Sequence, residues 1–446
     1  MAETTLQKMR SALKINENGD ISFNSTGNDM LDVLFMSEYY TRHLNEVDSK
    51  VGEGEKWKLF SMFMRDPRFG LGRRDLGRRL MSLTGVSLGD VVKAGRYDDI
   101  FFFNEWMEFL RDEIDKGNEL AKKWAPRYSS KNLMLARDFA RFLGLNKQKY
   151  GKYVKTKTVE RSLSSKHTEL IKFEHVPSLA MVKYYKRFAR GNDTKERFKQ
   201  YLEDVRSGKK ELKVSTTTVY DIYRNLKDID ADLFFSKIEK IAVNCIPVVD
   251  TSSSMFSNDA MGKAFAVGHY LAKCSTYAPD TVITFSSEPH LIHLGDEPVL
   301  KSERYRHYFT GLFGTPKEDD GQYIREMRSM YTGDCSNTDF AKVMDLLSTF
   351  EDLPEYLVFL TDNEFDSGSL RRREDMTRVW KENGYTTKLI WWNFNSRNAT
   401  VPEMDDSGNI YISGYSPMLL KYLDAGFDGQ KFLDKLLEEY KKKVSE

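Results

Sequence analysis

One change of hydrophobic pattern, near residue 241, constrains the fold of this 446-residue chain more than any other feature. Before it, apolar residues recur at the spacing of amphipathic helices, in stretches such as MLDVLFMSEYYTRHL and LMLARDFARFLG. After it, short apolar runs such as IAVNCIPVVD and EYLVFLTD alternate with helical segments, which is typical of a parallel sheet covered by helices on both faces. The pattern therefore predicts two different kinds of domain in one chain.

The first half is predicted to be an all-α helical-repeat region of the HEAT-like kind. Proline and glycine stand between its helical stretches, and no β-alternating run interrupts them. No fixed repeat period is visible, so any repeats have diverged. We expect residues 1–235 to form this helical domain, and residues 236–446 to form a doubly wound, Rossmann-like α/β domain of about 200 residues.

The distribution of charge follows the same division. Residues 1–240 contain 46 Lys and Arg against 35 Asp and Glu, and the rest of the chain contains 22 against 32, although the formal net charge of the whole is only +1. Residues 121–200 alone carry 21 basic and 6 acidic side chains. This concentration favours a polyanion-binding surface over a merely solvated set of helix faces.

Targeting signals and cysteine spacing exclude several classes of protein. The opening MAETTLQKMRSALK lacks the apolar core of a signal peptide, and no apolar run approaches the roughly 20 residues of a membrane-spanning helix. Cys245, Cys274 and Cys335 have unrelated spacings that fit neither a disulfide framework nor a zinc site. We therefore expect a cytoplasmic protein with buried thiols and no membrane partner.

Oxygen-bearing side chains stand at the ends of two predicted strands. Asp250, Ser252 and Ser254 follow the first strand at alternate positions, Thr338 opens a later helix, and Asp362 ends the strand EYLVFLTD. The carboxyl ends of the strands meet at one edge of an α/β sheet, so these oxygens could all point at one hard divalent cation. Any one of them could instead cap a helix. The five together, in this order, predict a metal site.

The order Asp250-x-Ser252-x-Ser254, then Thr338, then Asp362 resembles the metal-ion-dependent adhesion site of von Willebrand factor A domains. The resemblance implies Mg²⁺, or another divalent cation, bound directly by the hydroxyls and the threonine and largely through water by the aspartates. It also implies an acidic group from a protein partner in the coordination shell. Ser253 stands where many relatives have glycine, but that position is not a ligand.

Three basic clusters are candidate RNA contacts, because arginine forks match phosphate oxygens and aromatic rings beside cations suit unpaired bases. One surrounds the turn in MFMRDPRFGLGRRDLGRRLM, one begins at Lys147 and includes Tyr150 and Tyr153, and one follows VPSLAM. The candidate RNA-binding residues are Arg65, Arg68, Arg73, Arg74, Lys147, Lys149, Lys152, Lys155, Lys157, Arg161, Lys166, Lys183, Lys186 and Arg187. For the arginines of the first cluster a structural role, holding helices together at a tight turn, is the alternative.

A basic helical region followed by a metal-site domain is similar to the layout of the TROVE-module ring proteins, the Ro autoantigen family. RDPRFGLGRR resembles the arginine- and glycine-containing turn of that module, while KWAPR, VPSLA, FLTDNEFD and WWNF resemble an uncharacterised branch found in phages and plants. The resemblance implies a closed ring of helical repeats that takes single-stranded ends of misfolded RNAs through a basic hole and binds small structured RNAs outside. A phage-encoded protein would act in the host cytoplasm.

These observations predict a non-enzymatic RNA-binding scaffold with a Mg²⁺-dependent site for an acidic protein partner, and no DNA binding. The alternative is a protein adhesion or assembly module without RNA binding, whose helical array would bind peptides. A metal-dependent hydrolase is a third possibility, because a bound cation can lower the pKa of water. Only Glu364 and His269 are obvious candidate bases for that chemistry.

Overall fold

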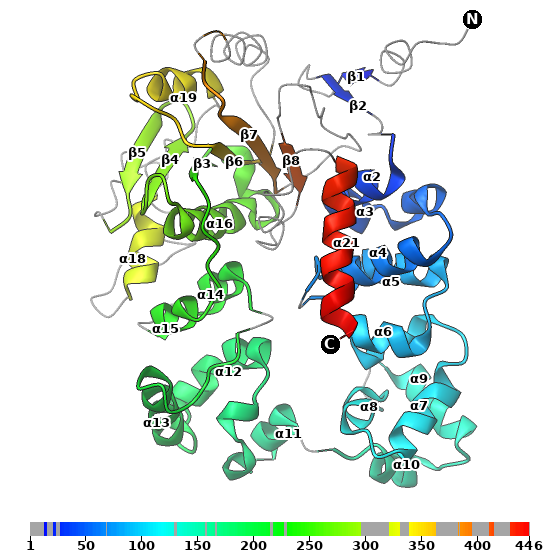
Figure 1. The fold of residues 1–446 in the computed structure, drawn as a ribbon. Helices are drawn as coiled ribbons and strands as arrows, with labels where there is room; N and C mark the ends of the chain where they lie inside the picture. Colours follow the sequence, from blue (N-terminus) through cyan, green and yellow to red (C-terminus); the bar gives the residue numbers. More distant parts are fainter. Residues whose placement is uncertain are drawn as a thin grey trace, which may run out of the picture. The chain divides into compact units, whose positions relative to one another are not determined.

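The computed structural model describes residues 13–15, 21–23, 27–67, 69–128, 132–156, 158–165, 167–214, 217–226, 230–295, 321–330, 339–362, 382, 384–394, 410–413 and 429–445. The chain forms two compact units, coloured by sequence in Figure 1. We call Met1–His43 with Val214–Leu433 the sheet unit, and Leu44–Lys213 with Asp434–Glu446 the helical unit. Within these described ranges, no helix is both long and apolar enough to cross a membrane.

The sheet unit contains a six-stranded sheet and helices from both ends of its sequence. Its strands in the large sheet are β3 (Cys245–Asp250), β4 (Thr281–Phe285), β5 (Pro289–His293), β6 (Tyr356–Thr361), β7 (Lys388–Asn393) and β8 (Ile410–Ser413). Its helices are α2 (Asp29–Phe35), α3 (Ser37–Arg42), α14 (Val219–Asn225), α15 (Asp230–Ser236), the 3-10 helix η5 (Ser253–Asp259), α16 (Ala260–Cys274), α18 (Gln322–Ser329) and α19 (Phe340–Leu347). A separate antiparallel pair, β1 (Leu13–Ile15) and β2 (Ile21–Phe23), shows that the all-helical prediction for the first half is wrong at its start.

The large sheet is mixed and not wholly parallel as predicted. Its strand order is β5-β4-β3-β6-β7-β8, and only the β4–β5 pair is antiparallel. The cause is the length of the connection, since only residues 286–288 separate β4 from β5. A parallel crossover needs a dozen or more residues, whereas a hairpin needs very few. The strands predicted in IAVNCIPVVD and EYLVFLTD are confirmed as β3 and β6.

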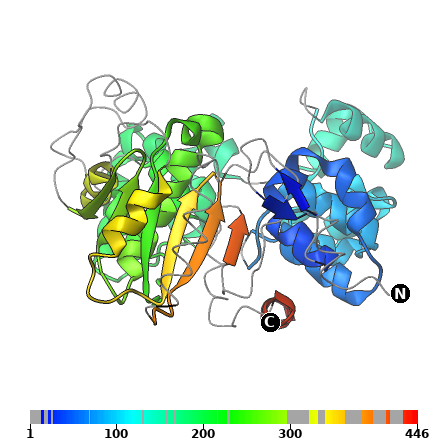
Figure 2. The ribbon, with the colours of Figure 1, turned by 90° about the horizontal axis from the view of Figure 1, so that it is seen from above.

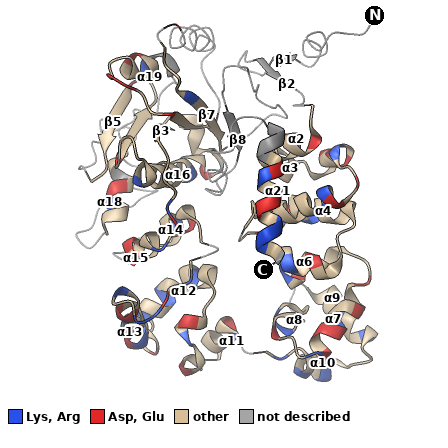
Figure 3. Ribbon diagram, viewed as in Figure 1, with Lys and Arg blue, Asp and Glu red and all other residues tan. Residues whose placement is uncertain are grey.

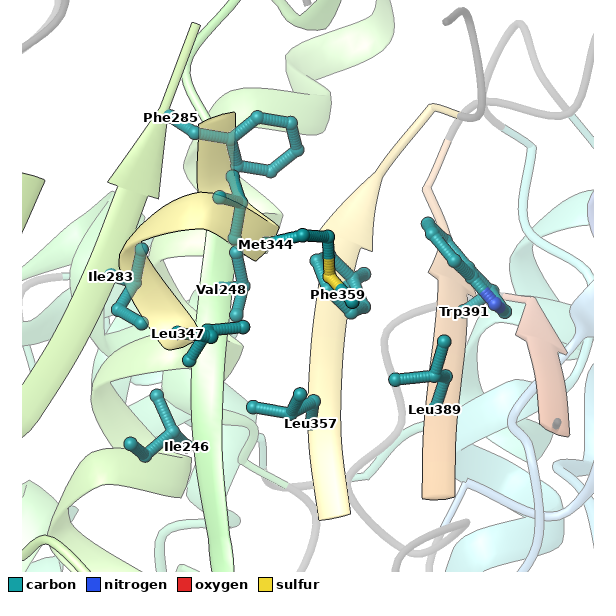
Figure 4. Close-up of a cluster of buried hydrophobic side chains, with 11 residues drawn as sticks. Ile246, Val248, Ile283, Phe285, Met344, Leu347, Leu357, Phe359, Leu389 and Trp391 are labelled. Carbon is teal, nitrogen blue, oxygen red and sulfur yellow. The ribbon is translucent and has the colours of Figure 1, made fainter. Parts of the chain in front are cut away.

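Helices lie on both faces of the sheet, as the alternation of strands and helices predicts (Figure 2). On one face, Met344 and Leu347 of α19 pack on side chains at alternate positions of β3, β4, β6 and β7 (Figure 4). On the other face, α16 approaches β3 so closely that a Cβ atom at Gly268 would lie 2.7 Å from Val249 Cγ2. Burial on both faces explains why β3 and β6 read as continuous apolar runs.

The helical unit is a succession of short helices. Its elements are η1 (Leu44–Lys50), α4 (Glu55–Arg65), α5 (Arg74–Thr84), α6 (Leu88–Ala94), η2 (Tyr97–Phe102), α7 (Trp106–Asp115), α8 (Glu119–Trp124), α9 (Leu133–Phe142), α10 (Lys147–Tyr153), α11 (Val159–Ser164), η3 (Thr168–Leu170), η4 (Phe173–His175), α12 (Ser178–Arg190), α13 (Lys195–Arg206) and, from Asp434 onward, α21 (Gly429–Ser445). The predicted helical character of this region is confirmed.

A buried carboxylate, Asp99 of η2, joins three segments of the helical unit. Arg65 Nη2 at the end of α4 lies 2.8 Å from Asp99 Oδ2, and the Nε of Arg78 in α5 donates to Asp99 Oδ1. The backbone N–H of Arg96 donates to Asp99 Oδ2 at 2.8 Å. Arg65 is only 3% exposed and Asp99 is fully buried. Several donors on one carboxylate offset the cost of burying these charges.

The last helix returns to the start of the helical unit. Tyr440 of α21 donates a hydrogen bond to Asp66 Oδ2 at 3.3 Å, its ring contacts that of Phe63, and Asp434 pairs with Lys56 at 2.7 Å. The sequence pattern placed this helix with the sheet. An amphipathic stripe shows that a helix has a buried face, but not which unit buries it. The predicted domain boundary between residues 235 and 236 stays a prediction.

Replacing Asp99 with alanine should destabilise the helical unit by about 3–5 kcal/mol, because Arg65 and Arg78 would lose their buried partner. Urea unfolding of the full chain, followed by circular dichroism, measures this loss. Asp138→Ala is the matched control, since Asp138 pairs with Arg141 at 3.3 Å at the surface and its loss should cost much less. Equal losses in the two variants would contradict the central role of Asp99.

Candidate metal centre and nucleic-acid interface

The candidate metal centre lies where the strand order of the sheet reverses. The chain runs from β3 to β4 on one side, whereas β6 adds to the other side of β3. Val249 of β3 is paired with Leu360 of β6, so the loops that follow these two strands leave the sheet side by side. Open α/β sheets bind their ligands at such a reversal, outside the carboxyl ends of the strands.

Asp250, the last residue of β3, is fully buried at this point. Its Oδ1 accepts a hydrogen bond from the backbone N–H of Ser252 at 2.8 Å, and its Oδ2 accepts one from the hydroxyl of Thr361 at 2.7 Å. The hydroxyl oxygens of Ser252 and Ser254 lie 3.0 Å apart. One carboxylate and two hydroxyls of the predicted set are thus gathered by a single loop.

A second buried carboxylate faces this group. Asp362 follows β6 directly and is only 4% exposed. Burial raises the pKa of Asp250 to about 7, and the charge of Asp362 acts in the same direction, against the hydrogen bonds from Ser252 and Thr361. Two buried carboxylates that act on each other in this way repel when both are charged. A divalent cation between them would remove that repulsion, and the hydroxyls supply further hard oxygen ligands.

The fifth predicted ligand, Thr338, lies outside the described residues. Its neighbour Asp339 is described, and the backbone N–H of Asp339 donates to the carbonyl of Ser286, just beyond β4, at 2.8 Å. Across the described ranges no three His, Cys, Asp or Glu side chains are grouped as metal ligands. A cation here would therefore depend on the hydroxyls as much as on the two carboxylates.

We call residues 250–259, which run from the end of β3 through η5, the metal loop. A contact that the sequence did not predict holds the last residue of this loop. Asp259 ends η5 and has a left-handed backbone conformation, with φ of 57°. Its carboxylate accepts a hydrogen bond from the hydroxyl of Tyr220 in α14. Asp adopts this conformation more easily than most residues, so little strain is stored. The signal in the sequence is weak, because Tyr220 lies 39 positions away from its partner.

His269, named as a candidate base, is fully buried in α16 and cannot meet a water at the metal loop. Its Nε2 lies 2.9 Å from Glu326 Oε2 in α18, and the rings of Phe235 and Tyr323 pack against it edge-on. Burial lowers the pKa of His269, against the attraction of Glu326. The residue joins α16 to α18. Glu364 lies outside the described residues.

The candidate RNA-binding lysines lie at the surface of the helical unit, where Lys and Arg recur on α10 and α12 (Figure 3). Within the described part of the chain, Lys149, Lys152 and Lys155 are exposed and have no carboxylate within 4.0 Å. The other exposed members are Lys147, Arg161, Lys183 and Lys186. Arg68, Lys157 and Lys166 lie outside the described residues.

The predicted arginines divide between the two roles left open. Arg65 is buried against Asp99 and is structural. Arg73 is partly buried, whereas Arg74 is exposed and pairs with Asp98 at 2.9 Å. Arg187 is exposed, and both its terminal nitrogens bind Asp193, at 2.9 and 3.1 Å. Guanidinium groups held by carboxylates in this way have fewer donors left for phosphate.

The tyrosines interleaved with these lysines are not the stacking surfaces that the sequence predicted. Tyr150 is 1% exposed and donates to the carbonyl of Pro126 at 2.7 Å, and Tyr153 donates to Asp115 at 2.8 Å. Tyr150 and Tyr153 are three positions apart, so they lie on one face of α10, away from the exposed Lys149 and Lys152. Trp57 and Trp106 are buried, and Trp124 is partly buried.

Comparison with known proteins gives limited matches. Residues 147–242 match a family described as a domain of unknown function, DUF2828. No curated protein matches the chain. Among solved structures, the chain is similar to the Ro (RSR) protein of Deinococcus radiodurans, at 11% sequence identity and a TM-score of 0.41, over 93% of this chain and 94% of that one.

In the presence of a chelator, Asp250→Asn should stabilise the sheet unit. The folded-state pKa of Asp250 lies above its ordinary 3.8. The folded state then holds the proton more tightly than the unfolded state, so stability falls as the pH rises from about 4 to about 7. Asparagine has no charge to bury, so above pH 7 the variant should gain at most about 4 kcal/mol.

Thermal unfolding with chelator at pH 5 and pH 8 measures this gain, with Asp345→Asn on the exposed face of α19 as the control. A larger gain at pH 5 than at pH 8, or no gain at either, would contradict the repulsion between the two carboxylates.

Proposed function

We propose that the protein is a non-enzymatic RNA-binding scaffold, with RNA on the helical unit and a divalent cation at the edge of the sheet. The observation that carries the RNA proposal is the set of exposed lysines on and after α10 that no described carboxylate neutralises. They belong to residues 121–200, which carry 21 basic and 6 acidic side chains. A field of this strength attracts phosphate and raises the rate of encounter with a polyanion.

The cation proposal rests on the group at the end of β3 and β6. Asp250, Ser252, Ser254, Thr338 and Asp362 would hold Mg²⁺, and the cation would supply a Lewis-acidic position open to an acidic group of a partner protein. The chain's own part is to hold the loop, through Thr361 on Asp250 and Tyr220 on Asp259. The von Willebrand factor A class of the sheet unit, the HEAT-like class of the helices and their closure into a ring belong to the same proposal.

A protein-assembly module without RNA binding is the second candidate. It is favoured by apolar side chains exposed on the helical unit, among them Met134 at 66% and Leu120 at 58%. Single exposed apolar residues are normal on protein surfaces, so this support is weaker than that of the lysines. Catalysis has less support still, because burial removes His269 from the metal loop.

The triple variant Lys149/Lys152/Lys155→Glu should bind single-stranded RNA at least tenfold more weakly than the wild type. Three lost phosphate contacts should also reduce the slope of log K against log salt by about 2. Fluorescence anisotropy with a labelled oligonucleotide across a salt series measures both quantities. Lys237/Lys240/Lys342→Glu makes the same charge change on exposed lysines of the sheet unit and should have little effect. Equal losses in the two variants would overturn the assignment to the helical unit.

Added Mg²⁺ should stabilise the sheet unit by about 2.7 kcal/mol at a hundredfold excess over Kd and so raise its melting temperature. Ser252→Ala/Ser254→Ala should lose most of that rise, because both hydroxyls are proposed ligands. Differential scanning calorimetry with chelator and with Mg²⁺ gives the measurement. Ser348→Ala, at the exposed end of α19, is the control. An equal rise in both variants would exclude the site.

A further inference from the structure

One aromatic ring of the helical unit stands out by its exposure. Phe102, the last residue of η2, is 60% exposed, and Phe142 follows among the described aromatic rings at 38%. Exposure alone is common and identifies no site. The meaning of Phe102 depends on what lies behind its ring.

A fixed guanidinium group lies behind the ring. The Cζ atom of Arg78 is over the Phe102 ring, 4.6 Å from its centroid. Arg78 itself is 6% exposed, binds Asp99 through Nε and lies 3.4 Å from Asp98 Oδ2. The cation therefore covers one face of the ring and cannot swing away without breaking buried ion pairs. Phe102 nevertheless stays 60% exposed with the cation over its ring.

A second, more exposed arginine lies beside this pair. Arg74, one helical turn before Arg78, has a side chain 43% exposed and lies 2.9 Å from the same oxygen of Asp98 that Arg78 approaches. Two guanidinium groups thus share one carboxylate oxygen next to an exposed ring. Asp75, 60% exposed, is the acidic group nearest to Arg78 on the surface side. Arg74 binds Asp98 through Nη2 alone and is 43% exposed, so the rest of its guanidinium group can still donate to a phosphate oxygen.

We propose that Phe102 is a stacking platform for an unpaired base of RNA, with Arg78 behind the ring and Arg74 for an adjacent phosphate. This inference rests on the proposed RNA-binding function and names the part of the RNA that is recognised. Any base can stack on an aromatic face, so the platform selects unpaired over paired nucleotides and not one sequence over another. The exposed lysines on and after α10 would contact phosphates, which paired and unpaired RNA both carry. Stacking on Phe102 would add a preference for single strands.

The other rings with a cation beside them fit this role less well. Phe142 has Arg111 at 5.5 Å but is stacked on Phe139, so part of its surface serves the core. Trp124, with Arg96 at 5.2 Å, is partly buried. Phe102 alone among these described rings combines high exposure with a buried, ion-paired guanidinium. Phe142 is therefore a matched control.

The test uses the full chain and a short single-stranded RNA that contains 2-aminopurine, whose fluorescence falls when the base stacks. Phe102→Leu keeps an apolar side chain and removes the ring, while Phe102→Trp keeps a ring. We expect Phe102→Leu to bind roughly 5- to 100-fold more weakly, with an unchanged salt slope and no quenching. Phe102→Trp and Phe142→Leu should bind like the wild type and quench the probe.

Three results would overturn the platform, and they differ in what else they reject. If the wild type binds RNA but Phe102→Leu binds equally well and quenches equally, the RNA scaffold stands and Phe102 serves another contact. If Phe102→Leu and Phe142→Leu lose affinity alike, the loss is not specific to this ring. If the wild type does not bind RNA at low salt, both the platform and the proposed function fail together. Equal melting temperatures of the variants establish that each has folded.

Discussion

Two buried carboxylates, Asp250 and Asp362, stand at the carboxyl ends of neighbouring strands of the sheet unit, where burial and the charge of Asp362 raise the pKa of Asp250. The strand order reverses between β3 and β6, and the loops after these strands therefore carry both carboxylates to one place. Hydrogen bonds from Ser252 and Thr361 satisfy Asp250 but do not neutralise it. A site that holds two buried like charges has a reason to bind a cation, and this reason is independent of any resemblance to another family.

In the helical unit a buried carboxylate has buried arginines as partners instead of a second carboxylate. Asp99 gathers two buried arginines, so that guanidinium groups in a basic sequence segment are used to join α4, α5 and η2. Lys149, Lys152 and Lys155 have no such partner among the described residues and remain at the surface. In this unit, buried arginines hold helices together, whereas these lysines stay exposed. Arg78 is ion-paired with the buried Asp99, and its guanidinium group also lies over the exposed ring of Phe102.

Much of the fold follows from the sequence, and the exceptions have physical causes. The central strands β3 and β6 were predicted because residues buried on both faces give continuous apolar runs. The antiparallel β5 could be inferred only from the short connection at residues 286–288. The position of α21 could not be inferred, since Tyr440 meets Phe63 and Asp66 from almost the far end of the sequence. Tyr150 and Tyr153 were misassigned because their spacing of three places them on one face of a helix, and the sequence does not say which face is buried.

The sequence by itself determined the candidate residues: the two aspartates and two serines at strand ends, and the lysines of a strongly basic segment. These are local properties, because residue type, spacing and hydrophobic period are written along the chain. The tertiary structure decided which of them are buried and which lie together. Burial turned Arg65 into a structural residue and Tyr150 into core, and a contact between α5 and η2 placed Arg78 over the exposed ring of Phe102. Burial and long-range contact depend on how distant segments pack, which no local pattern specifies.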